Sequence, residues 1–491
     1  MSELDPDLCY PALCARDERF DGRHFVGVTS TGVYCRPICP ARTPRRDNCC
    51  FFRSAAAAQQ AGFRPCLRCR PEVAPNVGSW LGTSNTVSRG LALIASGALD
   101  GDDASVETLA ERLGVGARQL RRLFSQHLGA SPVAVAQTRR VLFAKQLLHD
   151  TRLPMAEVAL AAGFGSIRRF NETFLQLFGR PPGALRSKLV VTLPEGSVRA
   201  TGVAVRLRYR PPYDWAAMLA FLRARAVDGI EHVDAQTYRR TVLLEGVAGT
   251  IDVSHAGALH SLAVTIRVSD VRVLSKIVAR VRNLFDLDAD IGVIGAHLAL
   301  DPMLAPLLAS RPGLRTPGAW DSFELAMRAV LGQQVTVENG RRLVETLAHT
   351  CGTRLSGDSR LRLGFPTAAQ VEAADLSALA MPSARRQALV AIAQAALADP
   401  RLFEPSQSIE ETVAKLRAIR GVGDWTAHYI ALRGARESDA FPAGDVALLR
   451  QAVGDDGVRP SAAELTARAQ RWRPWRAYAA QHLWTADGDT T

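Results

Sequence analysis

Long apolar runs are absent from the 491-residue sequence, and no window approaches the roughly 20 uninterrupted apolar residues that a membrane helix needs. The opening residues, MSELDPDLC, are acidic and lack the apolar stretch of a secretory signal. We therefore expect no membrane contact and a cytoplasmic location.

Acidic residues are in deficit: 48 Asp and Glu stand against 60 Lys and Arg, which gives a net charge of +12. Arginine far outnumbers lysine, and arginine suits bidentate contacts to phosphate and to guanine edges. The composition predicts a polyanionic partner, although a GC-rich genome would also raise the arginine count. At about 150 residues per domain, the chain has room for three or four domains.

Cysteine is nearly missing from most of the chain. Eight of the nine cysteines lie within the first 69 residues, and only Cys351 lies beyond them. In a cytosolic chain such a cluster indicates metal ligation before disulfides. Cys35 and Cys39 form one close pair, and Cys66 and Cys69 form another, which is the pattern of a tetrahedral zinc site. The spacing alone favours an inert structural zinc ribbon over a reactive thiolate.

The residues around these pairs add to that interpretation. The segments FVGVTSTGVYCRPICPAR and AGFRPCLRCRPE resemble the N-terminal domain of Ada-type methylphosphotriester DNA methyltransferases, over about residues 9–72. The resemblance implies one zinc ion on Cys35, Cys39, Cys66 and Cys69, and transfer of a methyl group from a DNA phosphotriester to Cys35. Zinc would hold that cysteine as the nucleophilic thiolate.

Methylation would also change the charge of such a site. Four thiolates around zinc carry a formal charge of −2, and methylation of one thiolate halves it, so repair could become a switch to tighter DNA binding. Cys49 and Cys50 depart from the family pattern. We interpret them as packing residues that could compete for the metal.

Residues 87–188 show apolar residues at helical spacing without a strand-like run, which predicts an all-helical block. SVETLAERLGVGARQLRRLFSQHLG and MAEVALAAGFGSIRRFNETFLQLFG both read as helix, glycine-containing turn, helix. Two such units joined by a long helix resemble AraC-type DNA-binding domains. The second helix of each unit would then enter the major groove. Candidate base-reading residues, each also explicable as a phosphate contact or a solvated face, are Arg118, Gln119, Arg122, Ser166, Arg168, Arg169 and Asn171.

Alternating apolar residues at 203–209 and 262–268 predict an antiparallel sheet within 190–300, and helical periodicity returns from 301 to 484. The fold class is therefore multidomain α+β. The predicted parts are a small four-cysteine zinc domain, an all-helical double helix-turn-helix domain, a small antiparallel α/β domain and an all-helical domain. Their expected ranges are 1–74, 87–188, 200–300 and 301–485, with a linker at 75–86 and a frayed tail.

The segment LRAIRGVGDWTAHYI places Gly421 and Gly423 between two apolar helical stretches. Such a hairpin can expose backbone N–H groups to a DNA phosphate, or it can be an ordinary turn between helices. In FPAGDVALLR, the local pattern around Asp445 favours a helix cap.

Together, the hairpin, WTAHYIALRG, PAGD and RWRPWRAYAAQHLW resemble the helix–hairpin–helix DNA glycosylases of the 3-methyladenine type II group, over about residues 205–485. The resemblance implies that Asp445 is the catalytic carboxylate and that Trp425, Tyr429 and Trp484 form the base pocket. Lyase-competent relatives have a lysine where this chain has Trp425, so we expect monofunctional hydrolysis. At the position of Gln334, the resembled glycosylases have an apolar residue that wedges into the DNA stack.

The implied base excision is chemically favourable, because alkylation at a ring nitrogen makes the base cationic and weakens the glycosidic bond. Aromatic faces can hold the flipped, electron-poor base, and an ionised aspartate can stabilise an oxocarbenium-like transition state or orient water. No Pro-Cys-His-Arg motif occurs, and Cys351 lies in HTCGTR, so O6-alkylguanine transfer is not expected.

The leading hypothesis is a fused alkylation-response protein that accepts methyl groups, regulates transcription and excises alkylated bases. The alternative is a DNA-binding transcriptional regulator with a catalytically inactive glycosylase-like half. Expected partners are double-stranded DNA at damaged sites and promoters, and RNA polymerase for activation. We expect a bacterial, monomeric protein associated with the nucleoid when it is bound to DNA.

Overall fold

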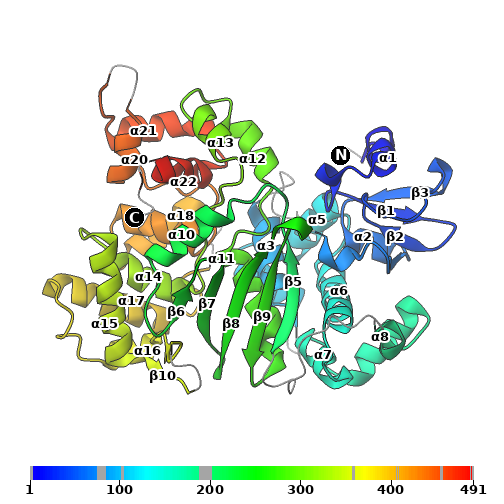
Figure 1. Ribbon diagram of the computed structural model, residues 1–491, viewed down its shortest axis with the longest axis horizontal. Coiled ribbons are helices and arrows are strands. Elements are labelled where there is room, and N and C mark those ends of the chain that lie inside the picture. The colour runs from blue at the N-terminus through cyan, green and yellow to red at the C-terminus, as the bar shows by residue number, and fades with distance from the viewer. Residues whose placement is uncertain are drawn as a thin grey trace. The chain divides into compact units, whose positions relative to one another are not determined.

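The computed structural model describes residues 4–74, 85–100, 104–186, 202–356, 360–404, 406, 408–453, 457–486 and 488 (Figure 1). The chain divides into two units, one of Met1–Tyr209 with Gly257–Ala279 and one of Arg210–Ala256 with Arg280–Thr491. Residues 75–84 of the predicted linker lie outside the described residues. The predicted domain boundaries stay a prediction.

The first unit begins with a small mixed sheet of order β3-β1-β2-β4, in which β2 and β4 run parallel and the other neighbours are antiparallel. Gly27 allows close packing on this sheet, because a Cβ there would lie 2.7 Å from the Phe52 ring. The β2–β4 pairing brings Cys35 near Cys66. The elements are α1 (Pro6–Ala15), η1 (Glu18–Phe20), β1 (Phe25–Val28), β2 (Val33–Cys35), η2 (Arg46–Asn48), β3 (Cys49–Phe52), α2 (Ala55–Gln60), β4 (Arg64–Pro65) and η3 (Pro71–Val73).

A helical block follows, and it confirms two helix-turn-helix pairs joined by the long helix α6 (Figure 1). Phe170, Phe174 and Phe178 recur every four residues and stack along one buried face, with ring centroids 4.8 and 5.3 Å apart. Gly129 and Gly179 end the second helix of each pair in the left-handed region. The helices are α3 (Asn85–Ala95), α4 (Val106–Arg112), α5 (Ala117–Leu128), α6 (Pro132–Asp150), α7 (Met155–Ala161), α8 (Ile167–Phe178) and η4 (Pro182–Leu185).

The predicted antiparallel strands are confirmed. In the first unit β5 (Val203–Arg208) pairs with β9 (Ser261–Val268), and Val205 lies opposite Val264. In the second unit three strands form an antiparallel meander. The remaining elements of this region are α10 (Trp215–Ala224), β6 (Glu231–Val233), β7 (Thr237–Leu244), β8 (Val247–Ala256), η5 (Gly257–Leu259), η6 (Val271–Val273) and α11 (Leu274–Leu284).

The rest of the second unit is helical, as predicted, except for the two-residue strands β10 and β11. Helix α14 is largely buried and packs against α15, α17 and α19. The elements are α12 (Ile291–Leu298), α13 (Ala305–Ser310), α14 (Ser322–Leu331), α15 (Val337–Cys351), β10 (Thr353–Arg354), β11 (Leu363–Gly364), α16 (Ala368–Ala373), α17 (Ser383–Ala398), α18 (Ile409–Arg417), α19 (Asp424–Arg433), α20 (Val446–Gln451), α21 (Ala462–Arg468), η7 (Ala469–Trp472) and α22 (Arg476–Ala486).

None of the described helices combines the length and apolar character needed to cross a membrane.

Candidate functional sites

Four buried sulfur atoms meet beside the small sheet and lie within 4.8 Å of one another. They belong to Cys35, Cys39, Cys66 and Cys69. A tetrahedral zinc ion with Zn–S distances of about 2.3 Å needs sulfur spacings of about 3.8 Å, so the donor set fits one Zn²⁺. The backbone N–H groups of Arg36 and Arg68 donate to the sulfurs of Cys69 and Cys66, both at 3.3 Å.

Two buried cations approach the loops that carry these ligands. The Arg36 guanidinium pairs with Asp21 and donates to the Cys69 carbonyl at 3.0 Å. Lys145 Nζ, from α6, donates to the Cys66 carbonyl at 3.1 Å and to Glu72 at 2.5 Å. Each cation is paired with a carboxylate, so its contribution at these loops is to hold the Cys69 and Cys66 carbonyls in place.

Cys49 and Cys50 lie on β3, outside the four-sulfur group. The Cys49 thiol donates to the carbonyl of Arg45 at 3.3 Å. The arrangement agrees with packing rather than with metal ligation.

The candidate reading residues of the first helix-turn-helix pair, Arg118, Gln119 and Arg122, are exposed on α5, while Leu120 and Phe124 on the opposite face are buried. This geometry leaves the amino-terminal half of the helix open to a ligand.

In the second helix-turn-helix pair, one of the candidate reading residues also caps its helix. Ser166 accepts a hydrogen bond from the N–H of Arg169 at 3.1 Å, so its hydroxyl caps α8. Arg168 pairs with Glu172 at 2.8 Å but remains 88% exposed. Arg169 and Asn171 are exposed beside it.

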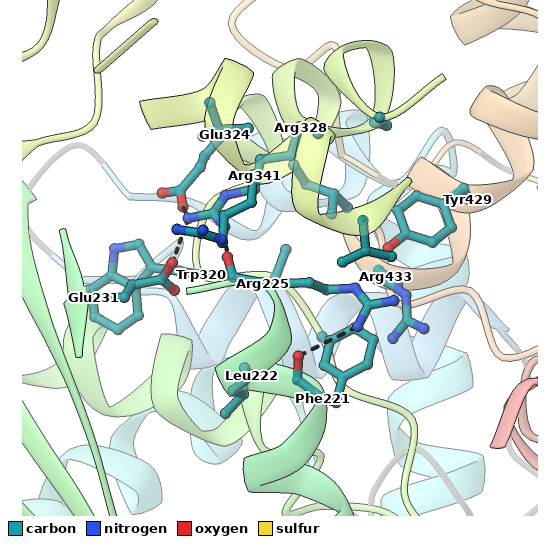
Figure 2. Close-up of a pocket in the computed structure, with 18 of the residues that line it drawn as sticks. Phe221, Leu222, Arg225, Glu231, Trp320, Glu324, Arg328, Arg341, Tyr429 and Arg433 are labelled. Atoms are coloured by element: carbon teal, nitrogen blue, oxygen red, sulfur yellow. Dashed lines mark hydrogen bonds and ion pairs between the residues drawn. The ribbon is translucent and has the colours of Figure 1, made fainter. Parts of the chain in front are cut away.

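The second unit contains a cavity of about 720 Å³, and its wall includes Asp445, Trp425, Tyr429 and Trp484. The structure therefore brings together the four residues predicted for catalysis and base binding. Figure 2 shows another part of this wall, where Arg433 lies beneath Tyr429 and beside Phe221.

Asp445 performs two tasks at once. Its Oδ1 accepts from the N–H groups of Ala447 and Leu448 at 3.0 and 3.1 Å, which caps α20. The indole N–H of Trp425 donates to Oδ2 at 2.6 Å, and that of Trp484 donates to Oδ1 at 3.0 Å. The cap expected from the local sequence is present, but the two indole contacts also fix the half-buried carboxylate at the cavity wall.

The aromatic side chains of the cavity contact one another. Trp425 stacks on Tyr429, with ring centroids 5.0 Å apart and planes at 12°, and Tyr429 meets Trp484 edge-on at 6.3 Å. The Arg433 guanidinium lies 5.2 Å from the centroids of both Tyr429 and Trp484. Burial lowers the pKa of Arg433 to about 10.

The predicted hairpin joins α18 to α19. Gly421 has φ +86°, and a Cβ there would lie 2.3 Å from that of Ala388, so only glycine fits. Gly423 precedes α19, and a Cβ there would meet open space. The hairpin can therefore approach a phosphate closely at Gly423.

Gln334 is exposed in the turn between α14 and α15, with φ +56°, and the cavity-wall residues Gly332 and Val335 flank its turn. Its neighbour Gln333 donates to Thr426 Oγ1 at 2.9 Å, and Arg385 donates to the Gln333 carbonyl at 2.6 Å. These bonds attach the predicted wedge turn to the start of α19 through Thr426 and to α17 through Arg385.

Three residues at these sites were missed by sequence reasoning: Gln333, Lys145 and Arg433. Arg433 had a readable signal, because it follows Tyr429 by four residues within WTAHYIALRG. Lys145 had none, since its partner Glu72 is distant in sequence.

Three family models match the chain: the metal binding domain of Ada at residues 8–72, a helix-turn-helix domain at 109–188, and the AlkA N-terminal domain at 204–321. A probable bifunctional transcriptional activator/DNA repair enzyme AlkA of Mycobacterium tuberculosis is 40% identical over 486 residues, which cover 98% of this chain and 96% of that protein. DNA-3-methyladenine glycosylase 2 of Escherichia coli is 36% identical over 285 residues, 57% of this chain and 97% of that protein.

A solved 3-methyladenine DNA-glycosylase from Archaeoglobus fulgidus matches with a TM-score of 0.52 at 18% identity, over 58% of this chain and 98% of that chain, which supports the glycosylase fold. The four-cysteine module, the paired helix-turn-helix motifs and the helix–hairpin–helix cavity define a multidomain DNA-repair protein with a regulatory half. The chain belongs to the family of bifunctional transcriptional activator/DNA repair proteins that join Ada-type and AlkA-type domains.

Proposed function

We propose that this protein senses and repairs alkylated DNA by three linked activities: methyl acceptance at Cys35, regulatory DNA binding through α5 and α8, and excision of alkylated bases at Asp445. The observation that carries the enzymatic part is the clamp on Asp445, because a purely structural cap needs no indole N–H donors from two separate helices. The names of its relatives, a transcriptional activator/DNA repair enzyme and a DNA-3-methyladenine glycosylase, support the combination of regulation with base excision.

In the methyl-transfer step, the Cys35 thiolate attacks the methyl carbon of a phosphotriester. A sulfur–carbon bond forms, the carbon–oxygen bond breaks, and the phosphodiester leaves as an anion. When bound, Zn²⁺ keeps the cysteine ionised at neutral pH. The thioether product is stable, so each chain accepts one methyl group, and the reaction is stoichiometric.

In base excision, the flipped nucleotide enters the cavity and the carboxylate of Asp445 faces the positive charge that develops on the sugar. Aromatic faces at Trp425 and Trp484 hold the base. Water completes the hydrolysis, and the position after the hairpin holds no amine that could form a Schiff base. Gln334, exposed at its turn, fills the space left by the extruded base.

In DNA binding, the exposed side chains of α5 and α8 read base edges or contact phosphates, and the hairpin at Gly421 and Gly423 contacts the backbone of damaged DNA. We further propose a monomer that contacts RNA polymerase at promoters and is associated with the nucleoid while bound to DNA. Methylation removes one negative charge near the phosphates, so it tightens operator binding.

Incubation of the intact protein with methylated DNA tests these activities together. Mass spectrometry should show one added methyl group per chain, mapped to Cys35, and chromatography should show released alkylated bases. The methylated protein should bind its operator more tightly, with the difference shrinking as salt increases. A methyl group on Cys49 or Cys50, or equal affinities at every salt concentration, would contradict the respective step.

A further inference from the structure

The side chains of Trp425, Tyr429 and Arg433 form a ladder along one face of α19. They are four residues apart, so they project from successive turns of the helix. Trp425 stacks on Tyr429 at 5.0 Å, and the guanidinium of Arg433 lies 5.2 Å from the Tyr429 centroid. The ladder thus connects the indole that holds Asp445 to a cation in the same cavity wall.

Arg433 is only 3% exposed, and its hydrogen-bond acceptors are neutral. It donates to the carbonyl of Pro317 at 2.8 Å and to Gln481 Oε1 at 3.2 Å. Its other contacts are the face of Phe221 at 4.5 Å (Figure 2) and the face of Trp484 at 5.2 Å. No carboxylate pairs with it among the described residues.

Burying this charge is costly for the fold. Its Nε has no hydrogen-bond partner within the described part of the chain, and a buried, unpaired donor destabilises a protein. Methionine would fill the same space without that cost but would leave the Pro317 carbonyl and Gln481 Oε1 without this donor. These two hydrogen bonds require a donor at this position, but they do not require a positive charge.

The charge does act on the aromatic rings. A cation over a ring face uses the same negative quadrupole that attracts a cationic base. It also repels any second positive charge that enters the cavity, and burial of the guanidinium weakens the screening of that repulsion by water.

We propose that Arg433 is a specificity-determining residue: it holds the Trp425–Tyr429 stack, and its charge reduces the preference of the cavity for cationic over neutral damaged bases. This inference rests on the proposed base excision and specifies its range of substrates. It predicts that removing the charge sharpens selection for cationic lesions.

The test compares excision of cationic 7-methylguanine and neutral hypoxanthine from otherwise identical duplexes. The measured quantity is the ratio of kcat/KM for the two bases, in the wild type and in Arg433→Met, Arg433→Gln and Arg433→Lys. The ratio should rise about tenfold towards the cationic base in the two uncharged variants and stay near the wild-type value in Arg433→Lys, which keeps the charge. A purely structural role would slow both reactions without changing their ratio.

Arg223→Met is the matched control, because it removes one exposed arginine charge from α10 of the same unit and should leave the ratio unchanged. Thermal melts show whether each variant is folded. Arg433→Gln is included because it retains an amide donor for the Pro317 carbonyl. An unchanged ratio in both uncharged variants would overturn the inference, as would their common failure to fold.

Measurements on the wild-type protein distinguish the proposed base excision from the proposed role of Arg433. Release of neither base would contradict the proposed excision itself. Release of 7-methylguanine by the wild type, with the same ratio of the two bases in the uncharged variants, would leave excision standing but would contradict the role of Arg433.

Discussion

The indole N–H of Trp425 donates to the carboxylate of Asp445 over 2.6 Å, although the two residues are 20 positions apart in the chain. The same indole stacks on Tyr429. One side chain thus orients the carboxylate and forms part of the aromatic wall. In the proposed mechanism, base binding and transition-state stabilisation are therefore coupled through Trp425.

Replacing Trp425 with phenylalanine separates these two roles. Trp425→Phe keeps an aromatic ring for stacking but removes the N–H, and a hydrogen bond to a charged group contributes about 1.5–3 kcal/mol. We expect kcat for base release to fall about tenfold to hundredfold with little change in KM, whereas Trp425→Ala should also raise KM. Single-turnover and steady-state kinetics measure both. Wild-type kcat in Trp425→Phe would show that the N–H is dispensable.

The zinc ligands can be tested by metal content. Cys66→Ser removes one of four sulfur donors, and we expect strong loss of zinc together with loss of folded structure around β2 and β4. Cys49→Ser is the matched control, because Cys49 lies outside the four-sulfur group and should leave one zinc per chain. Elemental analysis after dialysis gives the result, and full zinc content in Cys66→Ser would show that the ligand set is wrong.

Lys145 and Glu72 form a buried ion pair in which both side chains have no exposed area. Lys145→Met leaves the Glu72 carboxylate buried, with Arg70 as its remaining ionic partner among the described residues, and breaking such a pair destabilises a protein by about 3–5 kcal/mol. We expect α6 to become sensitive to protease at lower urea concentrations. The double variant with Glu72→Gln should recover part of the loss, and an unchanged urea profile for Lys145→Met would contradict the assignment.

We expect His482 to make the stability of the second unit depend on pH. Burial lowers the pKa of His482 from about 6.5 to about 4. Between these two pH values the histidine is protonated in the unfolded chain but neutral in the folded chain. Stability is therefore lost as pH falls from about 6.5 towards 4, by up to about 3 kcal/mol. Urea midpoints measured at pH 7 and pH 5 should differ less in His482→Gln than in the wild type. Equal differences would exclude this histidine as a cause.

The sequence predicted much of this organisation because its strongest signals are local. Paired cysteines, helix–turn–helix periodicity and the GVG hairpin each occupy short segments. Asp445 illustrates the limit: its local pattern predicts the cap that it forms, while the indole donors come from α19 and α22 and cannot be read from nearby residues. Lys145 was missed for the same reason. Ser166 caps α8 through its hydroxyl, and its contact with DNA stays a prediction.

The excision of bases by Asp445→Asn compared with the wild type tests the central claim most directly. Asparagine still caps α20 through Oδ1, so the variant should fold and bind DNA as well as the wild type or better. Asp214→Asn, the same change at the N-cap of α10, is the control for substitution at a cap. We expect release of alkylated bases to fall by about 10²–10³-fold or more in Asp445→Asn, because the charge that stabilises the transition state is lost. Near-normal release by the folded Asp445→Asn protein would show that Asp445 is a structural cap and that the mechanism proposed for this chain is wrong.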